Sequence, residues 1–226
     1  MKYDRVFTAK FISRTSRFTA QAELDGNTET VHVKNTGRLR ELLIPGSKVI
    51  LTGSNNPSRK TKFDLIAVYK DNLGWVNIDS MAPNQVVREW LESRLAPFSD
   101  AESIKPEYAF GKSRIDFYIE CPGRQILMEV KGCTLEINGM GYFPDAPTER
   151  GIKHLHELSS ASEKGYECYI AFVIAMPGVK QVLPNTSSHP EFADALAEAR
   201  QSGVKVLYLP CSIDESSLNI SEYIED

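Results

Sequence analysis

SRIDFYIECPGRQILMEVKG, residues 113–132, decides the fold of the second half of this 226-residue chain. Apolar and polar residues alternate on both sides of a CPGR segment, which is typical of two half-buried strands joined by a turn. Pairing Glu120 with Gln125 across that turn fixes the register. Asp116 then lies directly across from Glu129, and Cβ atoms of opposed residues are about 5 Å apart.

An ammonium group joins this acidic pair, because side chains alternate along a strand and Lys131 therefore shares a face with Glu129. Two carboxylates suit Mg²⁺ or Mn²⁺, which takes the rest of its shell from water and phosphate. Such a cation acidifies a bound water and stabilises phosphoryl charge, while a nearby Lys orients or activates the nucleophile. An ordinary solvated salt bridge is the alternative. We predict Asp116, Glu129 and Lys131 as catalytic residues and the two acids as metal ligands, helped by a backbone carbonyl near Val130.

Composition is ordinary for a globular protein, with 42% hydrophobic and 25% charged residues. No apolar run approaches the roughly 20 residues that span a membrane, and the start of the chain lacks the apolar core of a secretion signal. The four cysteines form no C-x-x-C pair, which favours reduced thiols over a zinc site. We therefore expect a cytoplasmic protein with no membrane partner.

The net charge of −4 is distributed unevenly along the chain. Through Lys62 there are twelve Lys and Arg against five Asp and Glu, whereas the remainder has fourteen against twenty-five. A basic N-terminal module can follow phosphates while the acidic remainder stays solvated. A basic surface without a partner is the alternative.

Residues 3–79 contain short alternating segments separated by turns, which is typical of a small closed barrel. Asp25-Gly26 is a hairpin signal, and Pro45-Gly46 marks another turn. An OB-fold is the economical interpretation, although an SH3-like barrel would have the same pattern. We expect strands at residues 6–12, 17–24, 29–33, 48–52 and 63–69.

A change to helical periodicity near Asn84 predicts a second unit, so we expect domains at residues 1–80 and 81–226. Its predicted order of helices and strands is mixed α/β. The acidic tail from Ser212 is expected to be solvated. We expect helices at residues 84–96, 147–164 and 190–201, and strands at residues 103–110, 113–120, 125–132, 167–175 and 204–209.

Two basic loops of the barrel, residues 34–40 and 58–62, are candidate nucleic-acid contacts. In the first, Gly37 permits a tight turn and the arginines can grip phosphate. Structural turns with exposed cations are the alternative. A Gly-rich loop at residues 138–141 precedes the predicted helix 147–164. Arg150 and Lys153 lie at the start of that helix, where a cation could meet the scissile phosphate. The predicted contacts are Lys34, Asn35, Arg38, Arg40, Arg59, Lys60, Arg150 and Lys153.

Other residues have less specific signals. His154 and His156 point about 200° apart on a helix and cannot chelate one ion, so we expect His154 on the surface or beside the site. Glu89 could supply a further acid, but it falls nearly opposite the apolar stripe of its helix. Phe11 and Phe18 would stack bases if exposed, although aromatic residues on barrel strands are more often in the core.

Several stretches resemble the sugar fermentation stimulation protein (SfsA) family, and Asp followed by E-x-K on the next strand resembles the PD-(D/E)xK nuclease core. The resemblance covers about residues 10–210. It implies an N-terminal OB-fold, which decides between the two barrels, a C-terminal nuclease-like domain, and DNA binding without marked sequence preference. The stretches are VKNTGRL (33–39), ELLIPG (41–46), SRIDF (113–117), EVKGCTL (129–135) and GYFPDAPTERG (141–151).

The resulting hypothesis is a DNA-binding protein with a phosphodiester-cleaving site that depends on Mg²⁺ or Mn²⁺. One alternative is a non-catalytic DNA-binding regulator of sugar metabolism genes that keeps only the nuclease fold. Another is a metal-dependent enzyme that acts on RNA or on a small phosphorylated substrate. The oligomeric state is not predicted.

Overall fold

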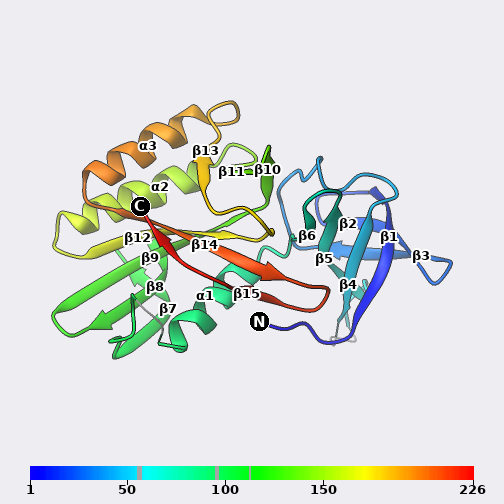
Figure 1. Ribbon diagram of the computed structural model, residues 1–226, viewed down its shortest axis with the longest axis horizontal. Coiled ribbons are helices and arrows are strands. Elements are labelled where there is room, and N and C mark those ends of the chain that lie inside the picture. Colours follow the sequence, from blue (N-terminus) through cyan, green and yellow to red (C-terminus); the bar gives the residue numbers. More distant parts are fainter. Residues whose placement is uncertain (55–57, 95–96, 112) are drawn as a thin grey trace.

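The computed structural model describes residues 1–54, 58–94, 97–111 and 113–226. It has two units side by side, a closed β-barrel formed by the first third of the chain and a mixed α/β unit formed by the rest (Figure 1). Parts of the predicted loop 54–61 and of the predicted helix 84–96 lie outside the described residues. Among the described residues, no helix is long and apolar enough to cross a membrane.

The barrel strands form one sheet: β1 (Val6–Arg14), β2 (Thr19–Leu24), β3 (Asn27–Val33), β4 (Lys48–Gly53), β5 (Phe63–Lys70) and β6 (Gly74–Asn77). Their order is β3-β2-β1-β4-β5-β6, and β3 also pairs with β5 in parallel, which closes the barrel. Small and branched side chains such as Ala22, Val31 and Val49 are buried inside it. The predicted OB-fold-like barrel is confirmed.

The α/β unit has a main sheet and a smaller one. The main sheet has the order β15-β14-β12-β9-β8-β7, with β16 beside β14, and the smaller sheet has the order β10-β11-β13. The strands are β7 (Ser103–Phe110), β8 (Ser113–Cys121), β9 (Arg124–Cys133), β10 (Leu135–Ile137), β11 (Met140–Phe143), β12 (Glu167–Ile174), β13 (Val182–Pro184), β14 (Lys205–Ile213), β15 (Leu218–Ile220) and β16 (Ile224–Glu225). The helices are α1 (Ala82–Glu92), α2 (Glu149–Ser162) and α3 (Pro190–Gln201).

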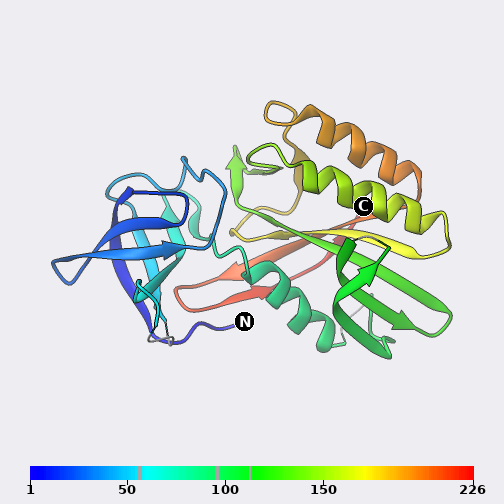
Figure 2. The ribbon, with the colours of Figure 1, turned by 180° about the vertical axis from the view of Figure 1, so that it is seen from behind.

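Helices cover both faces of the main sheet (Figure 2). Leu127 of β9 packs in one apolar cluster with residues of α2 and α3, whereas Met128 and Val130 pack with α1. β12 lies between β9 and β14 and is parallel to both, so the predicted central strand is confirmed. Side chains alternate along β9, and Glu129 and Lys131 therefore belong to the face that α2 covers.

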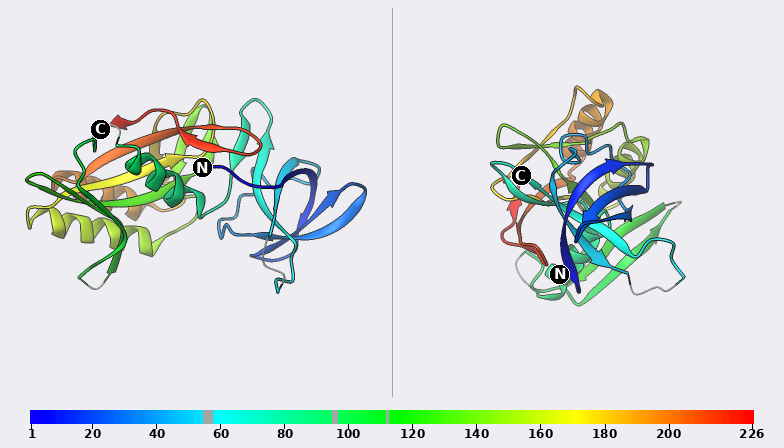
Figure 3. Two further views of the ribbon diagram at one scale, coloured as in Figure 1. Left: turned by 90° about the horizontal axis from the view of Figure 1, so that it is seen from below. Right: turned by 90° about the vertical axis from the view of Figure 1, so that its right-hand side faces the viewer.

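The two units are joined by more than the chain that connects them. The backbone N–H of Asn77, at the end of β6, donates to the carbonyl of Ala175 after β12, at 2.9 Å. The first residues of the chain run back to the α/β unit (Figure 3), where Lys2 forms a β-bridge with Ser217. The Met1 ammonium donates to the carbonyl of Leu218. The barrel is therefore attached to the α/β unit at both the start and the end of its sequence.

The prediction of a solvated tail is correct for its five acids, which are all exposed, but the segment is also part of the sheet. β15 and β16 both pair with β14, and the side chain of Leu218 is fully buried. The acids of this segment dominate its composition, but Ile213, Leu218 and Ile220 decide its position because they bury apolar surface.

Candidate active site

The hairpin of β8 and β9 has the predicted register. Regular antiparallel pairing runs from Cys121 with Arg124 to Phe117 with Met128, and it includes Glu120 with Gln125. The next opposed pair in that register would be Asp116 and Glu129. The ladder between β8 and β9 ends before this pair, while β8 remains paired with β7 and β9 with β12.

The Asp116 carboxylate lies where the two strands part. One of its oxygens accepts a hydrogen bond from the backbone N–H of Val130 at 2.8 Å, and the other accepts from the amide of Asn84 at 2.7 Å. Burial raises the pKa of Asp116 to about 6, and the charge of Glu129 adds to the rise. Asp116 is therefore fixed in position and electrostatically coupled to Glu129.

Glu129 is 2% exposed and has unequal oxygens. Its Oε1 atom accepts from the Lys131 ammonium at 2.6 Å and contacts Nδ1 of His154. Burial alone would raise the pKa of Glu129, but the hydrogen bonds from His154 and Lys131 outweigh it and lower this pKa below its ordinary value. The Oε2 atom is buried and has no hydrogen-bond partner among the described residues.

A divalent cation fits this donor set. A buried carboxylate oxygen without a partner is costly, and a carboxylate whose pKa is raised by a neighbouring carboxylate is relieved by a cation. Within residues 1–54, 58–94, 97–111 and 113–226, no three His, Cys, Asp or Glu side chains converge as a complete metal cage. Two carboxylates with several waters is nevertheless the way in which proteins commonly hold Mg²⁺.

Helix α1 is held close to this site. An added Cβ at Gly132 would lie 2.8 Å from Cγ of Pro83, so only glycine allows the first turn of α1 to approach β9 this closely. That approach brings Asn84 within hydrogen-bond distance of Asp116. The glycine after Lys131 thus has a structural reason that the E-V-K-G pattern alone does not reveal.

Cavities lie on both sides of the site. One of about 520 Å³ lies beside α1 and is lined by Asp116 together with Glu89 and Glu107. Another of about 580 Å³ lies beside α2 and is lined by His154 and by the cations Arg114, Arg150 and Lys153. Glu129 lines neither of them. The acidic and basic walls are therefore separated across the end of the hairpin.

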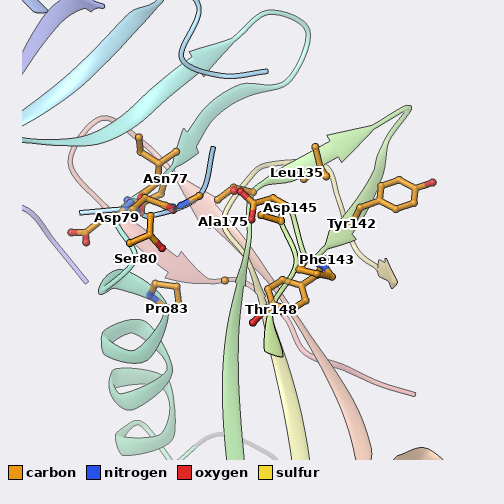
Figure 4. A pocket seen from close by; sticks show the side chains of 18 of the residues that line it. Asn77, Asp79, Ser80, Pro83, Leu135, Tyr142, Phe143, Asp145, Thr148 and Ala175 are labelled. Atoms are coloured by element: carbon orange, nitrogen blue, oxygen red, sulfur yellow. Dashed lines mark hydrogen bonds between the residues drawn. The ribbon is translucent and has the colours of Figure 1, made fainter. Parts of the chain in front are cut away.

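A third cavity, of about 580 Å³, lies between the barrel and the α/β unit (Figure 4). Asp79 and Ser80 reach it from the segment after β6, and Asp145 and Thr148 reach it from the segment before α2. Arg150 lines this cavity as well as the basic cavity beside α2. The cavity between the two units and the basic cavity beside α2 are therefore adjacent, with Arg150 between them.

The first basic loop rests against this third cavity, and part of it is used to build the protein. Lys34 forms ion pairs with Asp79 at 2.8 Å and with Asp64 at 3.5 Å. The Asn35 amide donates to the carbonyl of Ile78, and its oxygen accepts from the N–H of Gly37. Lys34 and Asn35 therefore have partners within the protein.

Gly37 does not serve the role expected of it, because it is not among the glycines with positive φ. An added Cβ there would lie 2.4 Å from the Asp145 carboxylate, so the glycine is required by close approach. The backbone of Arg38 hydrogen-bonds Asp145, which also holds this loop against the α/β unit. The side chains of Arg38 and Arg40 are exposed.

The remaining predicted nucleic-acid contacts also divide into side chains that are paired within the protein and side chains that are exposed. Arg59 forms an ion pair with Asp64 at 2.5 Å, whereas Lys60 is exposed. Arg150 is exposed, and Lys153 is exposed with a distant partner in Glu157 at 3.7 Å.

The barrel aromatics differ in exposure. Phe11 is buried and Phe18 is 47% exposed. Phe18 also lies beside the Arg17 guanidinium, at 5.6 Å from its ring centre. Only the second of these rings is exposed, and it also stacks against His32, with 6.4 Å between the ring centres.

One residue at the site has no signal in the sequence, and two others have only a partial one. Sequence pattern marks Asn84 only as a helix start, and its contact with Asp116 depends on where α1 docks. His154 is buried beside Glu129, so the expected position beside the site is correct and the surface position is not. Glu89 lines the acidic cavity, but its carboxylate is paired with the Met1 ammonium at 2.7 Å.

Comparison with known proteins identifies the family. The family described as SfsA N-terminal OB domain matches residues 12–78, and the Sugar fermentation stimulation protein RE domain matches residues 81–217. The chain belongs to the SfsA family. It is 48% identical over 226 residues to a Sugar fermentation stimulation protein homolog of Clostridium beijerinckii, with 100% of this chain and 99% of that protein covered. A homolog of Desulfitobacterium hafniense is 49% identical over 224 residues, with 99% and 97% covered.

A solved SfsA structure has the same fold. Pyrococcus furiosus SfsA, described in complex with Ca²⁺, is 28% identical to this chain and superposes with a TM-score of 0.88. The match covers 100% of this chain and 95% of that one. The whole SfsA fold, barrel and α/β unit together, is therefore present here.

Proposed function

We propose that this SfsA protein binds DNA and hydrolyses its phosphodiester bonds at Asp116, Glu129 and Lys131 with the help of Mg²⁺ or Mn²⁺. The observation that carries the proposal is the buried Oε2 atom of Glu129, which has no partner among the described residues and lies in a carboxylate that is coupled to Asp116. The Ca²⁺ complex of the Pyrococcus relative supports a site for a hard divalent cation in this fold. We also propose that the two units divide near residue 80, between β6 and α1.

In this proposal Asp116 and Glu129 hold the cation, together with a backbone carbonyl near Val130. A cation held there would supply Lewis-acid chemistry, since it would lower the pKa of a bound water and stabilise charge on the phosphoryl oxygens. Asn84 and the backbone N–H of Val130 keep the Asp116 carboxylate in place. Lys131 keeps Glu129 ionised through their 2.6 Å contact and orients the attacking water.

The distribution of charge around the site supports a position for the bound DNA strand. Phosphates are attracted to the basic wall formed by Arg114, Arg150 and Lys153, and the acidic wall beside α1 is left to cations. We propose that the exposed Arg38, Arg40 and Lys60 contact phosphates farther along the strand. In the same proposal, the ion pairs and hydrogen bonds of Lys34, Asn35 and Arg59 shape the loops that present them.

The direct test is a cleavage assay with the full chain. Labelled single-stranded and duplex DNA are incubated with Mn²⁺ or Mg²⁺, and the reaction is repeated with EDTA and with Asp116→Ala protein purified identically. We expect cleavage that EDTA and the substitution both abolish. Cleavage that survives the substitution would come from a contaminant, and metal binding without any cleavage would favour a non-catalytic DNA-binding protein.

DNA retention gives an independent prediction. Each lost phosphate contact lowers the slope of log affinity against log salt by about 0.9 for duplex DNA, so an Arg38→Gln/Arg40→Gln variant should lose close to two. The matched control is Arg200→Gln/Lys205→Gln, which removes two cations that are paired with acids at the end of the α/β unit away from the barrel (Figure 1). Fluorescence anisotropy over a salt series measures both, and equal slopes would contradict the assignment.

A further inference from the structure

His154 is a buried histidine that the proposed mechanism leaves without a task. It lies on α2 and is 5% exposed. Its Nδ1 atom is within hydrogen-bond distance of Oε1 of Glu129, and its Nε2 atom lies 3.4 Å from Nε of Arg150. One imidazole thus connects an exposed cation in the basic wall with the most buried carboxylate of the site.

The partners of the two ring nitrogens determine the tautomer. Arg150 has only donors, so Nε2 must accept, and the proton of the neutral ring is then on Nδ1. Ionised Glu129 has only acceptors, and therefore Nδ1–H donates to Oε1. The Lys131 ammonium, 3.2 Å from Nδ1, is also a donor, so it shares Oε1 with the ring and does not bond to it.

Two donors on the same oxygen fix the rotation of the Glu129 carboxylate. Oε1 is held by His154 from α2 and by Lys131 from the same strand. A carboxylate is planar, so the direction of Oε2 is then settled, and that atom has no partner among the described residues. Without the imidazole, the Lys131 ammonium alone would hold Oε1, on a flexible four-carbon stem.

We infer that His154 is a positioning residue, which holds Oε1 of Glu129 so that Oε2 is presented to a divalent cation. The inference rests on the metal site proposed above, and it adds a residue that neither touches the cation nor lies on the hairpin. Hydrogen-bond partners of metal ligands typically contribute 10- to 100-fold to metal affinity. We therefore expect loss of the His154 imidazole to lower the metal affinity by a factor in that range.

Two amide substitutions separate positioning from packing. In His154→Asn the amide nitrogen is attached to Cγ, as Nδ1 is in histidine, and can still donate to Glu129. In His154→Gln the same amide group lies one bond farther out, near the position of Nε2, and the donor to Glu129 is lost. His156→Gln is the matched control, because His156 is exposed on the same helix.

The measurement is Mn²⁺ affinity by calorimetry in the absence of DNA, with thermal melting of each variant. We expect His154→Gln to bind Mn²⁺ 10- to 100-fold more weakly than the wild type, and His154→Asn and His156→Gln to remain within about threefold. If His154→Gln does not fold, His154→Leu fills the space without a donor and should show the same loss.

Equal Mn²⁺ affinity in all variants, whatever their melting temperatures, would overturn the positioning role while the metal site stands. Equal loss in His154→Asn and His154→Gln would also overturn it, since rescue by the shorter amide is required. Absence of Mn²⁺ binding in the wild type would instead show that the metal site itself is wrong, and the inference would fall with it.

Discussion

Lys131→Met is expected to reduce the rate of DNA cleavage by about 10²- to 10³-fold, which is the range for loss of one preorganised donor at a reacting group. Lys131 is the ammonium next to Glu129, and its side chain is only 13% exposed. Met has a similar length and keeps the apolar stem in place without the charge. The loss should therefore appear in the turnover of bound DNA, and duplex affinity should change little.

The affinity for Mn²⁺ distinguishes a lysine that orients the water from a residue that binds the metal. In Lys131→Met the imidazole of His154 still holds Oε1 of Glu129, and removal of a cation beside two carboxylates favours a divalent ion. The variant should therefore bind Mn²⁺ as tightly as the wild type or more tightly. Lys105→Met on the neighbouring strand β7 is the control, because that Lys is exposed and its only ion pair among the described residues is a 4.0 Å contact with Glu120. If Lys131→Met cleaves DNA as the wild type does, the ammonium has no part in the chemistry.

Asp116→Asn is expected to stabilise the protein at neutral pH and to abolish cleavage. The pKa of Asp116 is raised to about 6, so ionising it in the folded protein is harder than in the unfolded chain, where its pKa is 3.8. Each unit of such a shift corresponds to about 1.4 kcal/mol, so the rise from 3.8 to about 6 is a penalty of about 3 kcal/mol that the neutral amide removes. We therefore expect the ionised Asp116 carboxylate to lower the stability of the metal-free protein.

The pH dependence has a definite sign. Below about pH 4 the carboxyl is protonated in both states, and wild type and Asp116→Asn should have similar stability. Between pH 4 and 6 the unfolded state loses its proton first, so the wild type becomes progressively less stable than the variant. Above pH 6 the difference is complete. Chemical denaturation at pH 3.5, 5 and 7.5 measures it.

Mn²⁺ should reverse this order. A ligand at 1,000 times its dissociation constant stabilises the native state by about 4.1 kcal/mol, which exceeds the penalty, and only the wild type keeps both carboxylates. Asp100→Asn is the control for sign, because hydrogen bonds from Arg124 lower the pKa of Asp100 and its removal should bring no gain at pH 7.5. An Asp116→Asn protein that is less stable than the wild type at pH 7.5 without metal would contradict the assignment.

The strands and their register could be predicted because they depend on local chemistry. Apolar alternation in β8 and β9 and the Pro-Gly turn between them were sufficient to pair Glu120 with Gln125. The apolar run of β12 likewise required cover on both faces. Such patterns are strong because a one-residue slip would turn a whole set of apolar side chains to the wrong face. The acids and the lysine of the site followed from this register.

The surroundings of those acids were decided only when the helices docked. Asn84 reaches Asp116 from α1, and His154 reaches Glu129 from α2, each across a long interval of sequence. Likewise, Lys34 meets Asp64 because β3 pairs with β5 when the barrel closes, whereas Arg59 pairs with Asp64 only five residues along the chain. A sequence by itself determined which segments are strands and which side chains share a face, since period and turn chemistry act between neighbours. Tertiary structure alone decided which charges are buried and paired, because burial and pairing depend on surfaces that meet only after the chain has folded.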